Sequence, residues 1–217
     1  MSKKLLAALG LALVWAVALA ADYSDTFSVD TGANAGCGAN WSPYPGGAAA
    51  TTGRQVTGGV CRITASFTQR TVEWNGGAVG NDQYSQVTLA AGTTDYNEGV
   101  AVRMSADTMY ACRRLDDATL RLVRFNAGVS TTLDTQAATL TTPVVIRIEV
   151  SGSDITCMVG GVTVIGPIAD GTPIASGQPG FYSANNADFD DWSGGDLGGG
   201  GGSSNAPRAM HYKKLMH

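Results

Sequence analysis

The amino-acid sequence predicts an all-β fold, in which two antiparallel sheets form a jelly-roll sandwich, and three observations support this prediction. No window of a dozen residues beyond the N-terminal apolar run shows a convincing helical period. Short runs rich in Val, Ile, Thr and aromatic residues recur instead, separated by Gly, Asn, Asp and Pro. Turn sequences suited to hairpins join several of these runs, among them the two glycines of Val159-Gly160-Gly161-Val162.

We expect strands, in chain order, at residues 23–27, 55–65, 71–74, 84–89, 98–104, 109–115, 119–126, 129–133, 144–150, 155–159, 162–165, 180–182 and 188–192. The clearest alternation lies in 144–150, where the even-numbered residues are apolar and should face the core. On the opposite face, Arg147 and Glu149 place a charge pair toward solvent or a groove. Residues 115–118 and 151–154 have the composition of hairpin turns.

The two ends of the predicted domain carry similar short acidic and aromatic phrases. Tyr23-Ser-Asp-Thr-Phe27 opens the domain, and Asp188-Phe-Asp-Asp-Trp192 closes it. We therefore expect the first and last strands to pair with each other.

Residues 1–20 have the features of a secretory signal peptide. Lys3 and Lys4 form a basic region, an apolar run follows, and Ala18 and Ala20 supply the small residues that a signal peptidase recognises. The alternative is an uncleaved anchor, although the apolar run falls short of the roughly 20 residues that a membrane span usually needs. No later stretch could cross a bilayer, so we expect a protein that is secreted, periplasmic or at the cell surface.

The C-terminal end has the composition of a linker and a tail. Residues 198–205 are rich in Gly and Ser, as in a flexible linker. Residues 206–217 form a basic segment, which is either disordered or a docking peptide for a protein partner. The docking alternative would use these anchors: Met210, Tyr212, Leu215 and Met216.

Residues 21–197 are expected to form one domain, and its composition excludes several classes of function. The domain holds all 18 acidic residues and nine arginines but no lysine, which gives a formal charge of −9. An acidic surface repels phosphate backbones, so we expect no nucleic-acid partner. Both histidines lie in the tail, so neither a Ser-His-Asp triad nor a histidine-ligated metal site is available in the domain.

Four cysteines, an even number in a chain that we expect to be exported, favour disulfides over metal ligation. We prefer Cys37–Cys61, which would attach a Gly-rich loop to a strand, and Cys112–Cys157, which would join strands far apart in sequence. Cys112 and Cys157 could instead be buried free thiols in small core positions.

Several phrases of the sequence resemble the concanavalin A-like superfamily, in particular bacterial or phage domains of its laminin-G or pentraxin type. These phrases are Gly99–Arg103, Tyr110–Arg113, Val145–Ser153, Val159–Gly161, Gly177–Tyr182 and Asp190–Trp192, with Ser24-Asp-Thr-Phe27 and Trp41-Ser-Pro43 near the start. The resemblance spans nearly all of 22–197 and implies a jelly roll with a concave sheet, where many relatives bind sugars. The phrases identify a fold, and one fold serves many functions.

Our first hypothesis is therefore a non-catalytic, lectin-like module that binds a glycan or a surface polysaccharide. Such a site needs aromatic rings for stacking and planar polar groups for sugar hydroxyls. Aromatic residues on or beside strands and arginines near them are the candidates, although packing in the core or on a strand surface could explain each. The ligand-binding candidates are Trp74, Tyr84, Tyr110, Arg103 and Arg113, with Tyr96 and Arg114 nearby.

Two other hypotheses remain open. A glycoside hydrolase or polysaccharide lyase could use the same scaffold, but the Glu-x-Asp-x-x-Glu pattern of jelly-roll glucanases is absent and the glutamates Glu73, Glu98 and Glu149 stand apart. We therefore expect no catalytic residues. A structural virion or cell-surface protein, docked by its tail, is the other alternative.

The resemblance implies no organic cofactor but allows one structural calcium ion near the loops. The candidate ligands are Asp25, Asp190, Asn185, Asn186 and Asp188.

Overall fold

The computed structural model describes residues 20–33, 35–43, 53–64, 70–90, 96–105 and 107–198, and none of these residues is helical. Apart from Ala20 and Gly198, the predicted signal peptide, linker and tail lie outside the described residues. No described helix is long and apolar enough to span a membrane.

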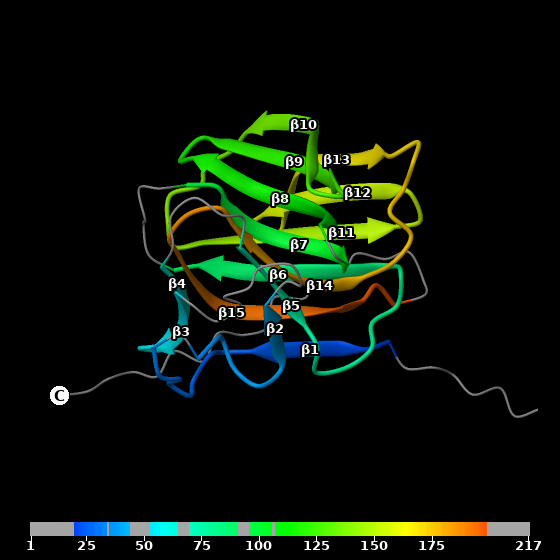
Figure 1. Cartoon of the computed structure of the whole chain (residues 1–217). Coiled ribbons are helices and arrows are strands. Elements are labelled where there is room, and N and C mark those ends of the chain that lie inside the picture. Colours follow the sequence, from blue (N-terminus) through cyan, green and yellow to red (C-terminus); the bar gives the residue numbers. More distant parts are fainter. Residues whose placement is uncertain are drawn as a thin grey trace, which may run out of the picture.

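Two antiparallel sheets pack face to face as a jelly-roll sandwich, which confirms the predicted fold class (Figure 1). The front sheet, nearer the viewer in Figure 1, has the strand order β10-β9-β8-β7-β14-β5-β2. Its strands are β2 (Trp41–Pro43), β5 (Arg70–Trp74), β7 (Glu98–Ser105), β8 (Thr108–Asp116), β9 (Thr119–Asn126), β10 (Val129–Ala137) and β14 (Gln178–Ser183).

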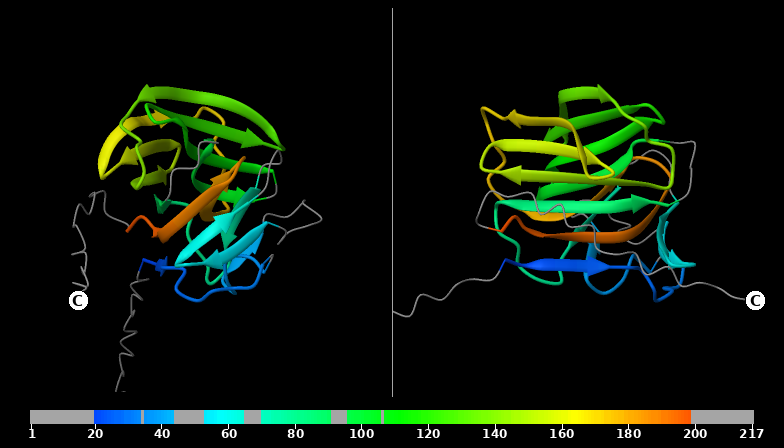
Figure 2. Two further views of the ribbon diagram at one scale, coloured as in Figure 1. Left: turned by 90° about the vertical axis from the view of Figure 1, so that its left-hand side faces the viewer. Right: turned by 180° about the vertical axis from the view of Figure 1, so that it is seen from behind.

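The back sheet has the order β13-β12-β11-β6-β15-β4-β3, with β1 paired to β15, and faces the viewer in the right-hand view of Figure 2. Its strands are β1 (Asp22–Asp25), β3 (Arg54–Thr57), β4 (Val60–Ile63), β6 (Gln83–Leu89), β11 (Val144–Ser151), β12 (Asp154–Val159), β13 (Val162–Ala169) and β15 (Ala187–Asp196).

The first and last strands pair as predicted, with Asp22 opposite Gly195 and Asp25 opposite Trp192. Asp25 also fixes the chain that follows, because its carboxylate accepts hydrogen bonds from the backbone N of Phe27 and from Nε1 of Trp41, both at 2.8 Å. The paired ends close the domain around a shared aromatic core.

The structure contradicts one predicted strand, which is a hairpin of two strands. Residues 55–65 were expected as a single strand, whereas the structure folds them into the β3–β4 hairpin. Gly58 and Gly59 make the turn with φ of 62° and 81°, a left-handed conformation that glycine adopts readily. The three-residue strand β2 is not among the predicted strands, because a segment of three residues carries too little alternation to be recognised.

The core between the sheets contains the apolar face of β11 that the alternation predicted, since Ile146, Ile148 and Val150 are all buried. Both predicted disulfides are present. Cys37–Cys61 attaches an N-terminal loop to β4. Cys112–Cys157 connects β8 of the front sheet to β12 of the back sheet, so it crosses the sandwich.

Candidate binding face

Trp74 packs inside the sandwich. Its side chain is 4% exposed, stacks on Trp192 with ring centroids 5.0 Å apart, and meets Trp41 edge-on at 5.4 Å. Val72, two residues earlier on β5, is buried in the same core, as expected for side chains that share one face of a strand. This placement corrects the prediction that Trp74 binds a ligand, because no face of its ring is left for stacking.

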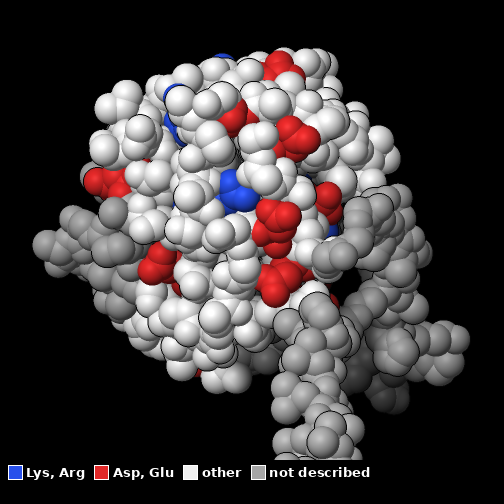
Figure 3. Space-filling model, turned by 90° about the vertical axis from the view of Figure 1, so that its right-hand side faces the viewer, with Lys and Arg blue, Asp and Glu red and all other residues white. Residues whose placement is uncertain are grey.

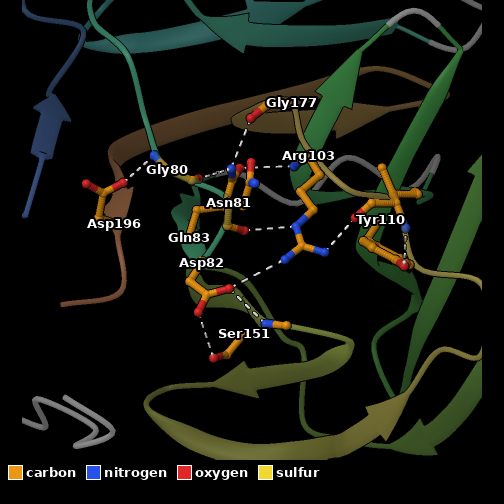
Figure 4. A network of polar contacts seen from close by, with 11 residues as sticks. Gly80, Asn81, Asp82, Gln83, Arg103, Tyr110, Ser151, Gly177 and Asp196 are labelled. Atoms are coloured by element: carbon orange, nitrogen blue, oxygen red, sulfur yellow. Dashed lines mark hydrogen bonds and ion pairs between the residues drawn. The ribbon is translucent and has the colours of Figure 1, made fainter. Parts of the chain in front are cut away.

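Arg103 and Tyr110 belong to a polar network that ties loops to strands at one end of the sandwich (Figure 4). Arg103 is 2% exposed and donates from Nε to the carbonyl of Asn81 (2.9 Å) and from Nη1 to that of Ile174 (2.5 Å). The Tyr110 hydroxyl donates to Asp170 (2.7 Å), and burial together with this bond raises the pKa of Tyr110 to about 12. This network corrects both ligand assignments, because the two side chains are buried and hold the fold together.

Tyr84 lies on the outer surface of the back sheet. The guanidinium carbon of Arg147 is 3.8 Å from the centroid of its ring, and its hydroxyl donates to Asp22. Arg147 in turn pairs with Glu149 at 2.7 Å, so the charge pair predicted on β11 is confirmed. Burial, with the bond to Asp22, raises the pKa of Tyr84 to about 12. The polar groups around Tyr84 therefore have partners within the protein.

Arg113, the fifth predicted residue, is half-buried on the side of the front sheet that faces away from the core, and we call this side the front face. Its central residues are buried, each at most 4% exposed: Thr71, Ala101, Ala111, Phe125 and Tyr182. We define the front face by Thr71, Glu73, Gly99, Ala101, Ala111, Arg113, Arg121, Phe125, Gln178, Gly180 and Tyr182. One row of directly opposed residues crosses it from β10 to β5: Thr135, Arg121, Arg113, Gly99, Tyr182 and Thr71.

Within this row, Nη1 of Arg113 donates to the hydroxyl of Tyr182 at 3.2 Å, and its guanidinium carbon lies 5.7 Å from the Tyr182 ring centroid. The contact crosses β7 at Gly99, which presents no side chain. A Cβ at Gly99 would lie 2.0 Å from the carbonyl oxygen of Cys112, so the close approach of β7 and β8 requires glycine here. Burial raises the pKa of Tyr182, which keeps its hydroxyl protonated.

A small apolar cluster supports the front face. The rings of Phe125 on β9 and Tyr182 on β14 stack with centroids 5.5 Å apart, although two strands separate them. The intervening strands carry Ala111 and Ala101, whose small side chains leave room for the two rings to meet. The cluster therefore fixes the Tyr182 ring, and with it the acceptor of Arg113.

Several polar groups of the front face have no partner in the described part of the protein. Oγ1 of Thr71, Nε of Arg113 and Oε1 of Gln178 are buried and make no hydrogen bond. The carboxylate of Glu73 is half-buried, and no hydrogen bond or ion pair is found for it; burial raises its pKa. Buried polar atoms without partners are costly. Because these three atoms each expose less than 1 Å², the groups that a ligand can reach are the carboxylate of Glu73 and the guanidinium of half-buried Arg113.

Tyr96 and Arg114 occupy the opposite end of the sandwich from the Arg103 network. Arg114 is 1% exposed and donates from Nε to Glu98 at 2.6 Å, with the ring of Tyr96 4.8 Å from its guanidinium carbon. Burial raises the pKa of Glu98 to about 7, although Arg114 acts in the opposite direction. These residues form a buried ion pair and lie away from the front face.

The oxygens proposed for calcium are partly engaged by the protein. Asp25 accepts two hydrogen bonds, as described above, and Asp188 binds Arg62 through both oxygens at 2.8 Å. Burial raises the pKa of Asp190. Among the described residues, no group of three His, Cys, Asp or Glu side chains is arranged to hold a metal ion. Calcium binding stays a prediction.

Of the residues that define the front face, only Arg113 was among the sequence-based ligand candidates; the polar residues that were missed include Thr71, Glu73, Arg121 and Tyr182. The strand prediction at 71–74 contained a signal for the first two. Val72 and Trp74 are the apolar positions of that strand, so Thr71 and Glu73 had to face away from the core. Tyr182 and Arg121 become neighbours of Arg113 only through strand register.

Acidic side chains outnumber basic ones in the predicted domain, which has a formal charge of −9. Figure 3 shows acidic side chains spread over the side of the sandwich that lies at the right in Figure 1. The acidic excess of the predicted domain is thus not confined to one patch, and the arginines of the front face stand in an overall negative molecule.

No family model and no curated protein matches the chain. Among solved structures, the carbohydrate binding module CBM66 from Bacillus subtilis has a TM-score of 0.54 at 14% identity and covers 70% of this chain and 91% of the module. The exoplasmic/lumenal domain of VIP36, in a Ca²⁺/Man3GlcNAc-bound form, has a TM-score of 0.50 at 14% identity, with 71% and 83% covered. The apo Crh5 transglycosylase has a TM-score of 0.53 at 12% identity, with 81% and 83% covered. Likeness at these identities shows the shared fold.

Proposed function

We propose that this protein is a non-catalytic, exported carbohydrate-binding module of the concanavalin A-like superfamily and that it binds glycans on its front face. The observation that carries this proposal is the contrast between the two outer surfaces. On the back sheet Tyr84, Arg147 and Glu149 are bonded to one another or to Asp22. On the front face the half-buried carboxylate of Glu73 has no hydrogen bond or ion pair, and half-buried Arg113 and Arg121 have no ion pair, among the described residues.

The chemistry of these groups suits sugar hydroxyls. A carboxylate accepts hydrogen bonds from hydroxyls, and a guanidinium donates to them. Glu73 lies on β5 and Arg113 on β8, three strand spacings away. At about 4.8 Å per spacing, the two residues are roughly 14 Å apart, so an oligosaccharide chain fits this face better than a single sugar.

A binding role is preferred over hydrolysis because the front face offers a single carboxylate. Retaining glycosidases use two carboxyl groups about 5–5.5 Å apart, and inverting enzymes use a similar pair with a wider gap. Among the residues that define the front face, Glu73 is the one carboxylate, and its neighbours across the sheet are Ser42 and Gly180.

The test is glycan binding by the purified protein on a glycan array, followed by titration calorimetry with each oligosaccharide that is retained. Glu73→Gln should weaken binding by about tenfold, the loss of roughly one charge-assisted hydrogen bond. Glu149→Gln is the matched control on the back sheet and should bind like the wild type. Failure to bind any glycan, or equal effects of the two substitutions, would overturn the proposal.

A further inference from the structure

We infer that the glycan carries carboxylate groups and that Arg113 and Arg121 bind them, an inference that rests on the proposed function of the front face. The two arginines are directly opposite each other on β8 and β9. Side chains that are directly opposed point to the same side of a sheet, and like charges at such positions repel. An anion placed between the two guanidiniums would remove this repulsion.

Most arginines of the described structure already pair with a carboxylate. The ion pairs are Arg62–Asp188, Arg103–Asp82, Arg114 with Glu98 and Asp117, Arg124–Asp170 and Arg147–Glu149. Arg113 and Arg121 depart from this pattern in a domain of formal charge −9. In the part of the chain that the structure describes, neither forms an ion pair with Asp or Glu.

The contacts that these two arginines do make leave most of their donors available. Arg113 donates from Nη1 to Tyr182, and its Nε is buried without a hydrogen-bond partner in the described part of the protein, so Nη2 is the nitrogen that is open to a ligand. Arg121 donates from Nε to Oγ1 of Thr135 at 3.3 Å. The carboxylate of Asp134, next to Thr135 in the chain, accepts hydrogen bonds from the backbone N of Thr135 and from Gln136, and no ion pair joins it to Arg121.

The planar guanidinium favours a carboxylate as the bound group. Two parallel N–H donors of arginine match the two oxygens of a carboxylate, which gives a bidentate contact with defined geometry. Arg113 is hydrogen-bonded to Tyr182, and Arg121 is hydrogen-bonded to Thr135. Since Arg113 and Arg121 are opposite each other on neighbouring strands, their two guanidiniums lie side by side. A uronic-acid chain presents carboxylates of this kind along its length.

The negative charge of the rest of the molecule sharpens this selectivity. Acidic side chains elsewhere repel a polyanion, but their effect is screened over a Debye length of about 8–10 Å in physiological salt. A chain of uronic acids should therefore bind where the two arginines lie in preference to the acidic surface elsewhere on the predicted domain.

The experiment compares oligogalacturonate with its fully methyl-esterified form, which has the same backbone but no charge, and with a neutral galactan and dextran sulfate. The wild-type protein should bind oligogalacturonate at least tenfold more tightly than the ester. Raising NaCl from about 0.05 M to about 0.5 M should weaken this binding. Arg113→Gln and Arg121→Gln should each lower the affinity at least tenfold, whereas Arg147→Gln, which removes the same charge from the back sheet, should not.

The outcomes separate the inference from the proposed function. Equal binding of acid and ester, or full affinity in Arg121→Gln, overturns the inference. Neutral glycans that bind and are lost in Glu73→Gln would leave the proposed function standing without it. Tight binding of dextran sulfate alone would overturn the carboxylate assignment, and silence on every glycan would overturn both. Within the described residues Arg121 has one side-chain hydrogen bond, to Thr135, so its variant should fold even if Arg113→Gln does not.

Discussion

Nη1 of Arg113 lies 3.2 Å from the hydroxyl of Tyr182, although a whole strand, β7, runs between the two residues. The contact is possible because β7 presents Gly99 at the crossing point. Tyr182 is itself held by the ring of Phe125. The orientation of one arginine of the front face thus depends on an aromatic side chain that a ligand need not touch.

The first prediction concerns this positioning. Tyr182→Phe keeps the ring and its stacking but removes the acceptor, so Arg113 should sample other orientations. We expect the free energy of unfolding to fall by about 1 kcal/mol and the affinity for the glycan to fall about three- to tenfold. Chemical denaturation and titration calorimetry would measure the two effects.

Tyr84→Phe provides the matched control, since it removes a hydroxyl that donates to Asp22 on the other outer surface. It should cost stability without any change in glycan affinity. Weaker binding in Tyr84→Phe, with Tyr182→Phe unaffected, would place the binding site on the back sheet.

The second prediction concerns Trp74, which separates a packing role from a ligand-binding role. Trp74→Phe should lower the free energy of unfolding by about 1–3 kcal/mol, because it leaves a gap in the contact with Trp192 and Trp41. Nε1 of Trp74 has no hydrogen-bond partner among the described residues, so the substitution removes no hydrogen bond seen in the structure. Thermal unfolding should show the loss, and the folded variant should keep its glycan affinity; the reverse result would restore Trp74 as a ligand residue.

The strands were predictable from the sequence where one face is apolar and the turn is local. Ile146, Ile148 and Val150 alternate within a single strand, and hairpin glycines mark its neighbours, so both the strand and its buried face follow from adjacent residues. The pairing of β1 with β15 was recognisable because both strands carry the same acidic and aromatic composition.

The candidate site was harder to predict because it depends on register between distant strands. Thr71, Gly99 and Tyr182 meet in one row only because β14 inserts between β5 and β7. A single aromatic residue on a predicted strand does not reveal from its type whether it is exposed or buried, so the sequence predicts Trp74 and Tyr110 as ligand residues although both are buried. Trp74 lies two residues after Val72, and Tyr110 lies two residues before Cys112. Residues two apart on a strand share a face, so both aromatic side chains face the core together with these apolar neighbours.

The third prediction concerns the two disulfides, which close loops of different length. The cysteines of Cys37–Cys61 are 24 residues apart, and those of Cys112–Cys157 are 45 apart. Chain entropy predicts a stabilisation of about 3.5 kcal/mol for the first and about 4 kcal/mol for the second. Each pair of cysteines should be replaced by alanine and the free energy of unfolding measured by urea denaturation. The loss should be slightly larger for Cys112–Cys157 than for Cys37–Cys61. Free thiols detected by mass spectrometry in the untreated protein would contradict this prediction.

The fourth prediction concerns pH. The pKa of Glu98 is raised by burial from 4.5 to about 7, so the folded protein binds a proton between these values that the unfolded chain releases. Stability should therefore be greatest below about pH 4.5, as far as this group is concerned, and should fall as pH rises through 7. Since one pKa unit corresponds to about 1.4 kcal/mol, we expect a loss of at least about 1 kcal/mol between pH 5 and pH 7.5.

Glu98→Gln tests this assignment, because it keeps an acceptor for Arg114 but cannot titrate. Urea denaturation at a series of pH values should show a flatter dependence in the variant than in the wild type. A wild-type stability that rises over the same interval would mean that attraction to Arg114 outweighs burial.

The last prediction links the predicted export signal to the fold. The backbone N of Ala21 lies 3.0 Å from Oδ2 of Asp196, and the carbonyl of Ala21 accepts from the backbone N of Asp196 at 2.7 Å. Cleavage after Ala20, as the sequence predicts, would turn this nitrogen into an α-ammonium and the hydrogen bond into an ion pair. Asp196→Asn should then destabilise a chain that begins at Ala21 by about 0.5–1 kcal/mol more than a chain that keeps Leu19 and Ala20, because only the former carries the charge at that position.

Thermal unfolding of the four proteins measures this difference, and N-terminal sequencing of the exported protein identifies the cleavage site. Equal losses in the two backgrounds would show that the contact is an ordinary backbone hydrogen bond, whatever the position of cleavage.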